Sequence, residues 1–219
     1  MKSTTNKKTR VYNILREKII KNELPQGMPV NEAEFAQQLG VSKTPVRESL
    51  LQLEREGFVE NIPGRGAIIS YITSREINEI FQIREILESG VVKTVATIKG
   101  NEELAKIREE YKRMLNSGES ALQEIPATGT FEDMHLAIIE ALDNHALTNI
   151  YTGLLDRIKR IRSYYGKKFS QKRLEDILIE HLEIMDAVFE GDTAAADEKM
   201  RLHLRHAASF LTGLDRYGL

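Results

Sequence analysis

Apolar residues recur every three or four positions over most of the chain, which is the spacing of one face of an α-helix. In residues 31–57 two such patterns follow each other closely, and Gly40 between them is suited to end a helix. Asn31 and Ser42 stand where the two helices would begin and can act as N-caps. The segment is therefore predicted to form two short helices joined by a tight turn. The apolar positions of their buried faces are Phe35, Leu39, Val46, Leu50 and Leu53.

Strand-forming residues follow directly. Residues 58–62 and 67–72 are rich in β-branched and aromatic side chains, and the Pro-Gly-Arg-Gly run of residues 63–66 is typical of a turn. We predict a small β-hairpin with Arg65 at its tip. In a helix-turn-helix the first residues of the second helix lie at base edges of the major groove. With a hairpin wing behind it, the pair of helices indicates DNA reading rather than ordinary helix packing.

Beyond residue 72 the apolar spacing is helical throughout. Thr73 and Glu76 form a capping-box pattern that starts the first of these helices. We therefore predict a mainly α protein with a winged helix-turn-helix domain of residues 1–72 and an all-helical bundle of residues 73–219. Helices are expected at residues 9–22, 76–99, 101–116, 127–142, 146–165, 171–190 and 193–214, after a disordered basic tail of residues 1–8.

Composition excludes several classes of protein. The chain has no Cys, which rules out a disulfide framework and thiolate metal sites. No apolar run approaches the length of a membrane span, so we expect a cytoplasmic protein without a membrane partner. The formal net charge is −2, but residues 1–70 hold eleven Lys and Arg against eight Glu, a net charge of +3, and the remainder has −5. Basic charge is thus concentrated in the domain that would meet DNA phosphates.

Residues 41–59, followed by the Gly-Arg-Gly-Ala run of residues 64–67, resemble the winged helix-turn-helix of GntR-type bacterial transcription regulators. The resemblance covers about the first third of the chain. In some members an arginine of the preceding helix also contacts DNA, but Ala33 stands at that position here, so no contact is expected from it. The DNA-contact residues that the resemblance implies are Ser42, Lys43, Thr44 and Arg47 in the second helix and Gly64, Arg65 and Gly66 in the wing.

Three histidines stand out in the second domain. His135, His181 and His203 lie on three separate predicted helices, each beside core-type residues. A single His on an apolar face is usually a packed or hydrogen-bonded residue, whereas three that converge in a bundle suit a divalent transition metal. Sequence spacing leaves both interpretations open. His145 is expected in a loop, and His206 is expected to be structural or on the surface.

The second domain is similar to the FCD branch of GntR regulators, whose all-helical domain binds effectors. The similarity is carried by the Arg-Glu-Ile-Leu-Glu run of residues 84–88 and by residues 180–192 and 200–204. It implies that the three histidines bind a metal of the Zn, Ni or Mn class. The usual fourth ligand, an Asp, is replaced by Phe131, and Glu132 could share the helix face of the first histidine. The fourth protein ligand is therefore open.

The same similarity implies that Arg84 is an effector-binding residue. A guanidinium can pair with a carboxylate through two hydrogen bonds, and a metal with an open position could hold the same small organic acid. The alternative is an ordinary pair with Glu88, four residues further along the same helix.

These observations predict a ligand-responsive DNA-binding transcription regulator. We expect a repressor that binds a two-fold operator as a homodimer, because one short helix and one wing make few base contacts. A small carboxylate that binds in a helical cavity is expected to release the repressor from its operator. Regulators that sense a metal ion or a fatty-acyl ligand, and a structural DNA-binding protein without effector, are the alternatives. A metal-dependent enzyme is disfavoured, although Glu132, Glu180 or Glu183 could serve as a base, because nucleophile, phosphate-loop and HExxH motifs are absent.

Overall fold

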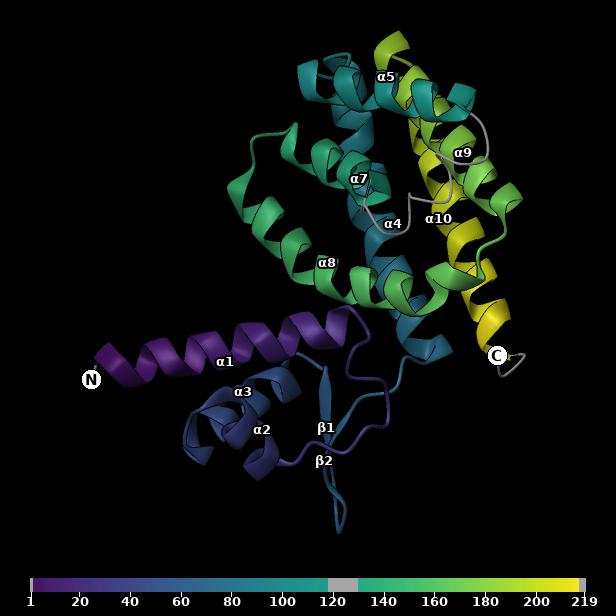
Figure 1. Cartoon of the computed structure of the whole chain (residues 1–219). Helices are drawn as coiled ribbons and strands as arrows, with labels where there is room; N and C mark the ends of the chain where they lie inside the picture. The colour runs from purple at the N-terminus through teal and green to yellow at the C-terminus, as the bar shows by residue number, and fades with distance from the viewer. Residues whose placement is uncertain (1, 118–129, 217–219) are drawn as a thin grey trace. The chain divides into compact units, whose positions relative to one another are not determined.

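The computed structural model of the chain describes residues 2–117 and 130–216. The chain forms two compact units, Met1–Ile72 and Thr73–Leu219 (Figure 1). The first is a winged helix-turn-helix and the second a helical bundle, so the predicted fold class is confirmed. Among the described residues, none of the helices combines the length and the apolar character that crossing a membrane requires.

The described part of the first unit contains α1 (Lys2–Ile20), α2 (Glu32–Leu39), α3 (Lys43–Arg55), β1 (Val59–Ile62) and β2 (Gly66–Ile69). α1 packs on α3, and Val11 and Leu53 are fully buried between the elements of this unit. Because α1 starts at Lys2, the prediction of a disordered tail was wrong for residues 2–8. Residues 2–20 contain neither Gly nor Pro, and extending a helix costs far less than starting one.

The helix-turn-helix has one side-chain cap where two were predicted. Asn31 caps α2, and its side chain accepts from the backbone N–H of Ala33 at 2.9 Å and of Glu34 at 3.4 Å. Gly40 ends α2 with a φ of 64°, a left-handed conformation that glycine adopts without steric cost. Ser42 is the N-cap residue of α3, but its side chain makes no capping hydrogen bond, which corrects the prediction. Its exposed hydroxyl is available to a ligand instead.

The wing is a short antiparallel hairpin whose register runs from Val59 opposite Ile69 to Ile62 opposite Gly66. A third extended segment, residues 27–30, lies along the other edge of β2. It is held by a bond of 2.8 Å from the N–H of Val30 to the carbonyl of Ala67 and by one of 2.9 Å from Ile69 to Met28. Strand β2 is thus paired along both of its edges, while the tip of the wing is exposed to solvent.

The described part of the second unit is helical. It contains α4 (Ser74–Thr97), α5 (Glu102–Ser117), α7 (Thr130–Glu140), α8 (His145–Tyr165), a 3-10 turn η1 (Gly166–Lys168), α9 (Gln171–Glu190) and α10 (Thr193–Arg216). Thr73 caps α4 by accepting from the N–H of Glu76 at 3.1 Å, as the capping-box pattern predicts. α4 and α10 run side by side along most of their length (Figure 1). The second unit is therefore built around a pair of long helices.

Several helix ends lie one or two residues from the predicted ones, and those of α8 and α7 are examples. α8 begins at His145, because the side chain of Asn144 accepts from the N–H of Leu147 at 3.1 Å and so acts as the cap. The prediction of His145 as a loop residue was therefore wrong. α7 ends at Glu140, two residues early, and Asp143 beyond it has a positive φ of 50°. Of the predicted helix 127–142, residues 127–129 lie outside the described residues.

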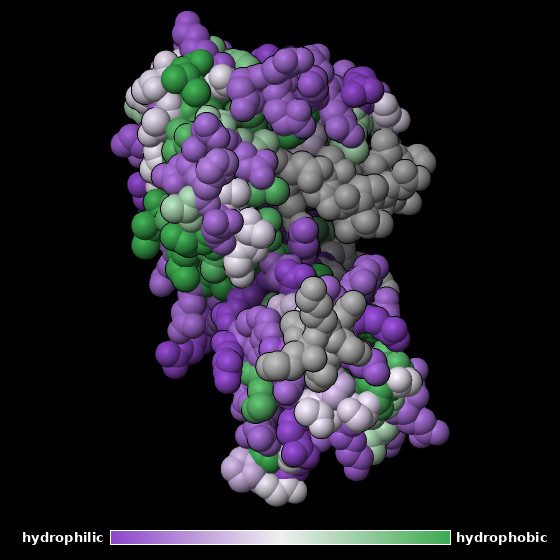
Figure 2. Space-filling view, turned by 90° about the vertical axis from the view of Figure 1, so that its left-hand side faces the viewer, coloured by the Kyte–Doolittle hydropathy of each residue, from purple (hydrophilic) through white to green (hydrophobic). Residues whose placement is uncertain are grey.

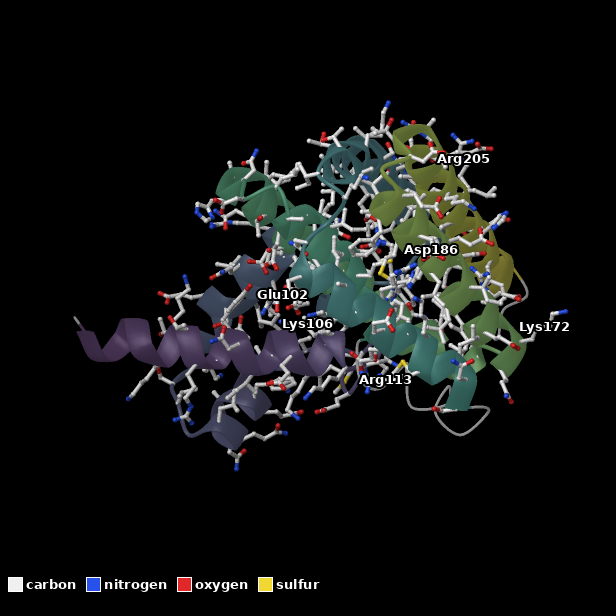
Figure 3. The ribbon with its side chains drawn as sticks, turned by 90° about the horizontal axis from the view of Figure 1, so that it is seen from above. Glu102, Lys106, Arg113, Lys172, Asp186 and Arg205 are labelled. Carbon is white, nitrogen blue, oxygen red and sulfur yellow. The ribbon has the colours of Figure 1, made fainter. Side chains whose placement is uncertain are left out.

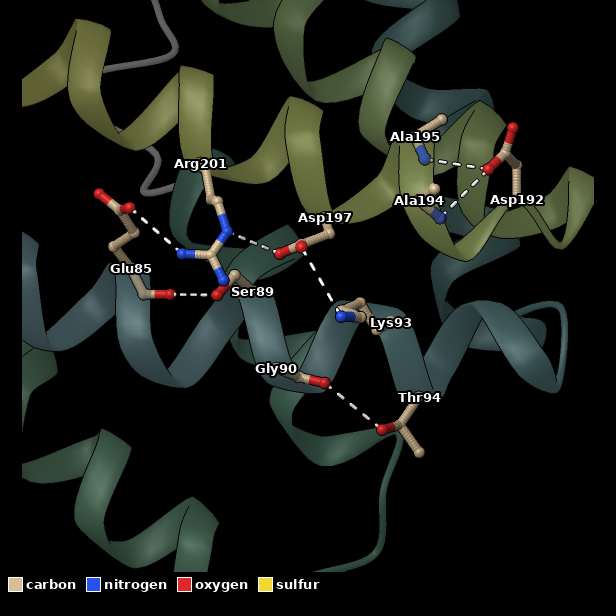
Figure 4. Close-up of polar contacts among 10 residues, drawn as sticks. All are labelled: Glu85, Ser89, Gly90, Lys93, Thr94, Asp192, Ala194, Ala195, Asp197 and Arg201. Carbon is tan, nitrogen blue, oxygen red and sulfur yellow. Dashed lines mark hydrogen bonds and ion pairs between the residues drawn. The ribbon is translucent and has the colours of Figure 1, made fainter.

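Ion pairs fix α4 against α10 (Figure 4). Arg201 of α10 donates to Glu85 of α4 at 3.3 Å and to Asp197, one turn earlier in its own helix, at 2.8 Å. Asp197 in turn lies 3.7 Å from the ammonium of Lys93. Arg205 adds a bond of 2.6 Å to Glu85. Carboxylates and cations of both helices thus form one connected network along the seam.

An ion pair links α5 to α9 through Asp186, which is labelled in Figure 3. Asp186 of α9 accepts from Nε of Arg108 at 2.6 Å, and the same guanidinium lies 5.3 Å from the centre of the Phe189 ring. Lys106 pairs with Glu102 one turn away at 3.4 Å and is solvent-exposed. The contact between Arg108 and Asp186 holds α5, the helix that carries Tyr111, against α9. The pair of Lys106 and Glu102 lies on the surface and contributes little to stability.

Candidate DNA-binding surface and candidate metal centre

The four residues predicted to contact DNA lie at the start of α3. Ser42 is the residue before the helix, and Lys43, Thr44 and Arg47 follow on its first turn and a half. All four are exposed, while Val46 beside them is fully buried. The buried face anchors the helix in the first unit, and the opposite face offers two cations and two hydroxyls to a partner.

Arg47 is held by a carboxylate from the neighbouring helix. Its Nε lies 3.0 Å from Oε1 and 3.2 Å from Oε2 of Glu32, and its Nη2 lies 3.0 Å from Oε2. Glu32 is the first residue of α2. Sequence reasoning did not connect the two, because they are fifteen residues apart and no helical spacing relates them.

The wing tip carries the other predicted contacts. Gly64 and Gly66 have φ angles of 78° and 76°, in the region that favours glycine, and Arg65 lies exposed between them. Without side chains on either side, the backbone at the tip can approach a phosphate closely. The wing therefore supplies one cation and a bare stretch of backbone.

The three predicted metal ligands converge in the second unit. His135 of α7, His181 of α9 and His203 of α10 are buried, and one ring nitrogen of each lies within 4.8 Å of the others. Nε2 of His181 lies 3.2 Å from Nε2 of His203. The ring of Tyr111 from α5 stacks on His181 with 5.7 Å between ring centres. The structure thus brings together residues that are separated by up to 68 positions.

Two carboxylates orient the imidazoles. Glu88 lies 2.7 Å from Nδ1 of His135, and Glu180 lies 2.7 Å from Nδ1 of His203. A carboxylate accepts only, so each of these Nδ1 atoms carries the proton and each Nε2 keeps its lone pair. This arrangement, in which a carboxylate holds the far nitrogen of a histidine, is the usual support of a metal-ligating imidazole.

Burial lowers the pKa of all three histidines, because an imidazolium loses its hydration in the interior. The pKa of His135 falls to about 3, with Glu88 opposing the fall. That of His181 lies well below its usual value, since burial is reinforced by the other histidines. Burial also lowers the pKa of His203, although Glu180 opposes it. At neutral pH all three are therefore uncharged, which is the form that binds a metal.

Arg84 is paired within its own helix. Its Nε donates to Oε1 of Glu88 at 2.7 Å, and both side chains are almost completely buried. The hydroxyl of Tyr151 donates to the same carboxylate oxygen at 2.8 Å. Burial alone would raise the pKa of Glu88, but the charge of Arg84 and the nearby His135 hold it below its usual range. The ion pair that the sequence left open as an alternative is present.

The triad fits a divalent transition metal. Nε2 of His135 is buried and has no hydrogen-bond partner among the described residues, so its lone pair is available to a metal that the other two histidines also reach. Zinc and its neighbours accept neutral imidazole nitrogens as ligands. Phe131 and Glu132 belong to α7, but their side chains lie outside the described residues. Among the residues whose side chains are described, the candidate metal ligands are the three histidines.

Sequence reasoning missed the residues that support the triad. The sequence suggests Glu180 only as a catalytic base. In the structure its carboxylate also accepts hydrogen bonds from Nδ1 of the half-exposed His206 at 3.1 Å and from Arg173 at 3.2 Å. Glu88 was considered only as a partner of Arg84. A charged residue at a core position of a helix was the signal for Glu88. For Glu180 the sequence held no comparable signal.

Two protein-family models match this chain, one in each of its two units. Residues 7–69 match the bacterial regulatory proteins of the gntR family, and residues 79–206 match the FCD domain. The uncharacterized HTH-type transcriptional regulator YdhC of Bacillus subtilis is 29% identical over 205 residues, 91% of this chain and 88% of its own. The HTH-type transcriptional repressor RspR of Escherichia coli is 23% identical over 90% of this chain and 85% of its own.

Solved structures share the fold. A putative GntR transcriptional regulator from Rhodococcus sp. RHA1 has a TM-score of 0.77 at 21% identity, covering 95% of this chain and 98% of that one. The Zn2+-bound FCD domain of TM0439, a putative transcriptional regulator, has a TM-score of 0.55 at 24% identity and covers 66% of this chain and 96% of its own. At these identities the likeness concerns the fold alone.

Proposed function

Because this chain belongs to the GntR family of bacterial transcription regulators and carries an FCD domain, it is a DNA-binding regulator rather than an enzyme, and we propose that it is a repressor released by a small carboxylate. The observation that carries the proposal is the convergence of three buried, neutral histidines on three helices. The likeness to the repressor RspR supports the direction of regulation.

In this proposal the start of α3 enters the major groove. Arg47 reads a base edge, Lys43 contacts phosphate, and Ser42 and Thr44 donate hydrogen bonds. The tip at Gly64, Arg65 and Gly66 reaches the neighbouring backbone or groove. The exposure of all these residues supports the assignment.

The operator is bound by a homodimer. One recognition helix and one wing supply too few contacts for operator-level affinity, and a two-fold dimer doubles them. Ile83 and Ile86 of α4 support self-association, since their side chains are neighbours on one helix face and are 42% and 72% exposed. Figure 2 shows hydrophobic residues exposed on a face of the second unit.

His135, His181 and His203 hold one divalent metal of the Zn, Ni or Mn class. Three imidazoles leave coordination positions that carboxylate oxygens can occupy. Arg84 contributes its charge to binding the same acid, and its position supports this role, because its partner Glu88 also binds His135 of the triad. Binding favours a state of the dimer whose recognition helices no longer match the half-sites, so the protein leaves its operator.

Metal content is the first test. The dialysed protein is analysed for metals beside His203→Ala and, as a matched control, His145→Ala, which removes an exposed histidine outside the triad. We expect about one metal per chain in the wild type and in the control, as a single-site triad requires, and none in His203→Ala. Metal retained by His203→Ala would overturn the site.

Release from DNA is the second test. An operator is selected from random-sequence DNA with the protein itself, and its affinity is measured by fluorescence anisotropy for the metal-loaded and metal-free protein with acetate, succinate and citrate. Weaker operator binding with an acid and metal together supports the proposal. Release by metal alone identifies a metal sensor instead. Operator affinity that none of these additions changes contradicts both.

A further inference from the structure

The pair of Arg47 and Glu32 uses one particular edge of the guanidinium. The carboxylate contacts Nε and Nη2 at 3.0 to 3.2 Å, which is the side edge of the planar group. Nη1 and the outer N–H of Nη2 take no part in these bonds. Those two donors form the end edge, which can bind O6 and N7 of a guanine together.

We infer that Glu32 is a positioning residue for base recognition: it holds Arg47 by its side edge so that its end edge is presented to the groove. The inference rests on the proposed contact of Arg47 with DNA. Glu32 itself touches no base in this arrangement. It acts by removing rotational freedom that a long, exposed side chain would otherwise lose when DNA binds.

The surroundings show which partner is the anchor. The side chain of Glu32 is 30% exposed and that of Arg47 is 67% exposed, so the arginine is the freer of the two. Glu32 is the first residue of α2, where the helix dipole favours a carboxylate and Asn31 fixes the backbone by capping. The carboxylate is thus held by its own helix, and the arginine is held by the carboxylate.

Electrostatics distinguishes this role from a passive one. A carboxylate near DNA repels every phosphate equally, so removing it should strengthen binding to all sequences if it does nothing else. A positioning carboxylate should instead be needed at one base pair in each half-site. Uniform repulsion lowers the affinity for all sequences alike, whereas positioning of Arg47 raises the ratio of specific to nonspecific affinity.

The test compares Glu32→Gln with Glu34→Gln in the full-length protein. Glu34 lies in the first turn of the same helix and contacts Asn31 rather than Arg47, so its variant removes an equal charge without touching the pair. Affinities are measured for the selected operator, for operators changed at each base pair of a half-site, and for unrelated DNA, at several salt concentrations. Thermal unfolding checks that both variants remain folded.

We expect Glu32→Gln to lower the preference for the correct base at one position by about threefold to tenfold, the usual effect of freeing one long side chain. Its salt slope should match the wild type, because no phosphate contact is lost, and binding to unrelated DNA should rise. Glu34→Gln should keep the base preference. Equal base preference in the two variants, or tighter operator binding by Glu32→Gln, would overturn the inference.

Arg47→Ala separates this failure from failure of the proposed function. If Arg47→Ala leaves base preference unchanged, the arginine does not read a base and the proposed contact is wrong. If Arg47→Ala relaxes the preference and Glu32→Gln does not, only the positioning role is wrong. The double variant should show the same base preference as Arg47→Ala alone, because Glu32 acts through the arginine.

Discussion

Glu88 accepts hydrogen bonds from three buried groups on three helices: Arg84, His135 and Tyr151. Its carboxylate therefore balances the one buried guanidinium of this network and orients one histidine at the same time. A buried charge that loses its partner is far more costly than an absent pair. The main role of Glu88 is therefore to stabilise the second unit, and any role in ligand binding requires that stable arrangement.

Replacing Glu88 by Gln should therefore destabilise the second unit strongly. Arg84 keeps its charge in the interior without an opposite charge, which costs about 3 to 5 kcal/mol of unfolding free energy. Urea unfolding followed by circular dichroism measures the change. Glu183→Gln on the exposed side of α9 is the control. A loss below about 1 kcal/mol would show that Arg84 finds another partner.

Arg47 and Lys43 should differ in kind although both are exposed cations of α3. Arg47→Ala is expected to cost about 1 to 3 kcal/mol of operator binding and to relax the preference at one base pair. Lys43→Ala should leave the preference intact and reduce the salt slope by about one. Anisotropy titrations over a salt series measure both. A loss that is uniform across sequences for Arg47→Ala would place it on phosphate.

At the scale of elements, partly exposed ion pairs contribute to the seam between α4 and α10. Arg205 donates to Glu85 and thereby lowers its pKa, although burial opposes the change. A carboxyl group whose pKa is lower in the folded than in the unfolded chain stabilises the fold. The contribution is complete at pH values above the pKa of the unfolded chain, which is about 4.3. That contribution disappears as the pH falls through the folded value.

Glu85→Gln should therefore weaken the fold only slightly and only near neutral pH. We expect a loss below about 1 kcal/mol at pH 7, because the pair is exposed to solvent on the arginine side. The difference from wild type should shrink at pH 3. Urea unfolding at the two pH values measures it, and a difference that grows on acidification would contradict the assignment of the pKa shift.

Local signals in the sequence predicted the elements well, whereas contacts between elements left few signals. Gly40 and Thr73 mark helix ends through their own backbone chemistry, so their roles follow from the residue type. The pair of Glu32 and Arg47 depends on how two helices face each other, which a period of 3.6 residues does not encode. The same holds for Glu180 beside His203. Convergence of the histidines was inferred from resemblance, since spacing alone left it open.

At the scale of the whole molecule, metal binding should be visible as stability. A ligand that binds only the folded chain raises the unfolding free energy by about 2.7 kcal/mol at one hundred times its Kd. Zn2+ added to metal-free protein should raise Tm, and a chelator should reverse the rise. His203→Ala should abolish the effect and His145→Ala should keep it. Thermal unfolding followed by circular dichroism measures these shifts, and an equal rise in both variants would place zinc elsewhere.

α4 begins directly after the boundary between the two units. Its first residue, Ser74, follows Ile72 of the wing domain after a single cap residue. Glu88 lies fourteen residues further, about 21 Å along the axis at 1.5 Å per residue. A helix of this kind does not shorten, so a shift of Glu88 along the axis displaces the start of α4 by nearly the same distance. The residue that orients His135 thus lies on the same helix that the chain enters directly after its DNA-binding unit.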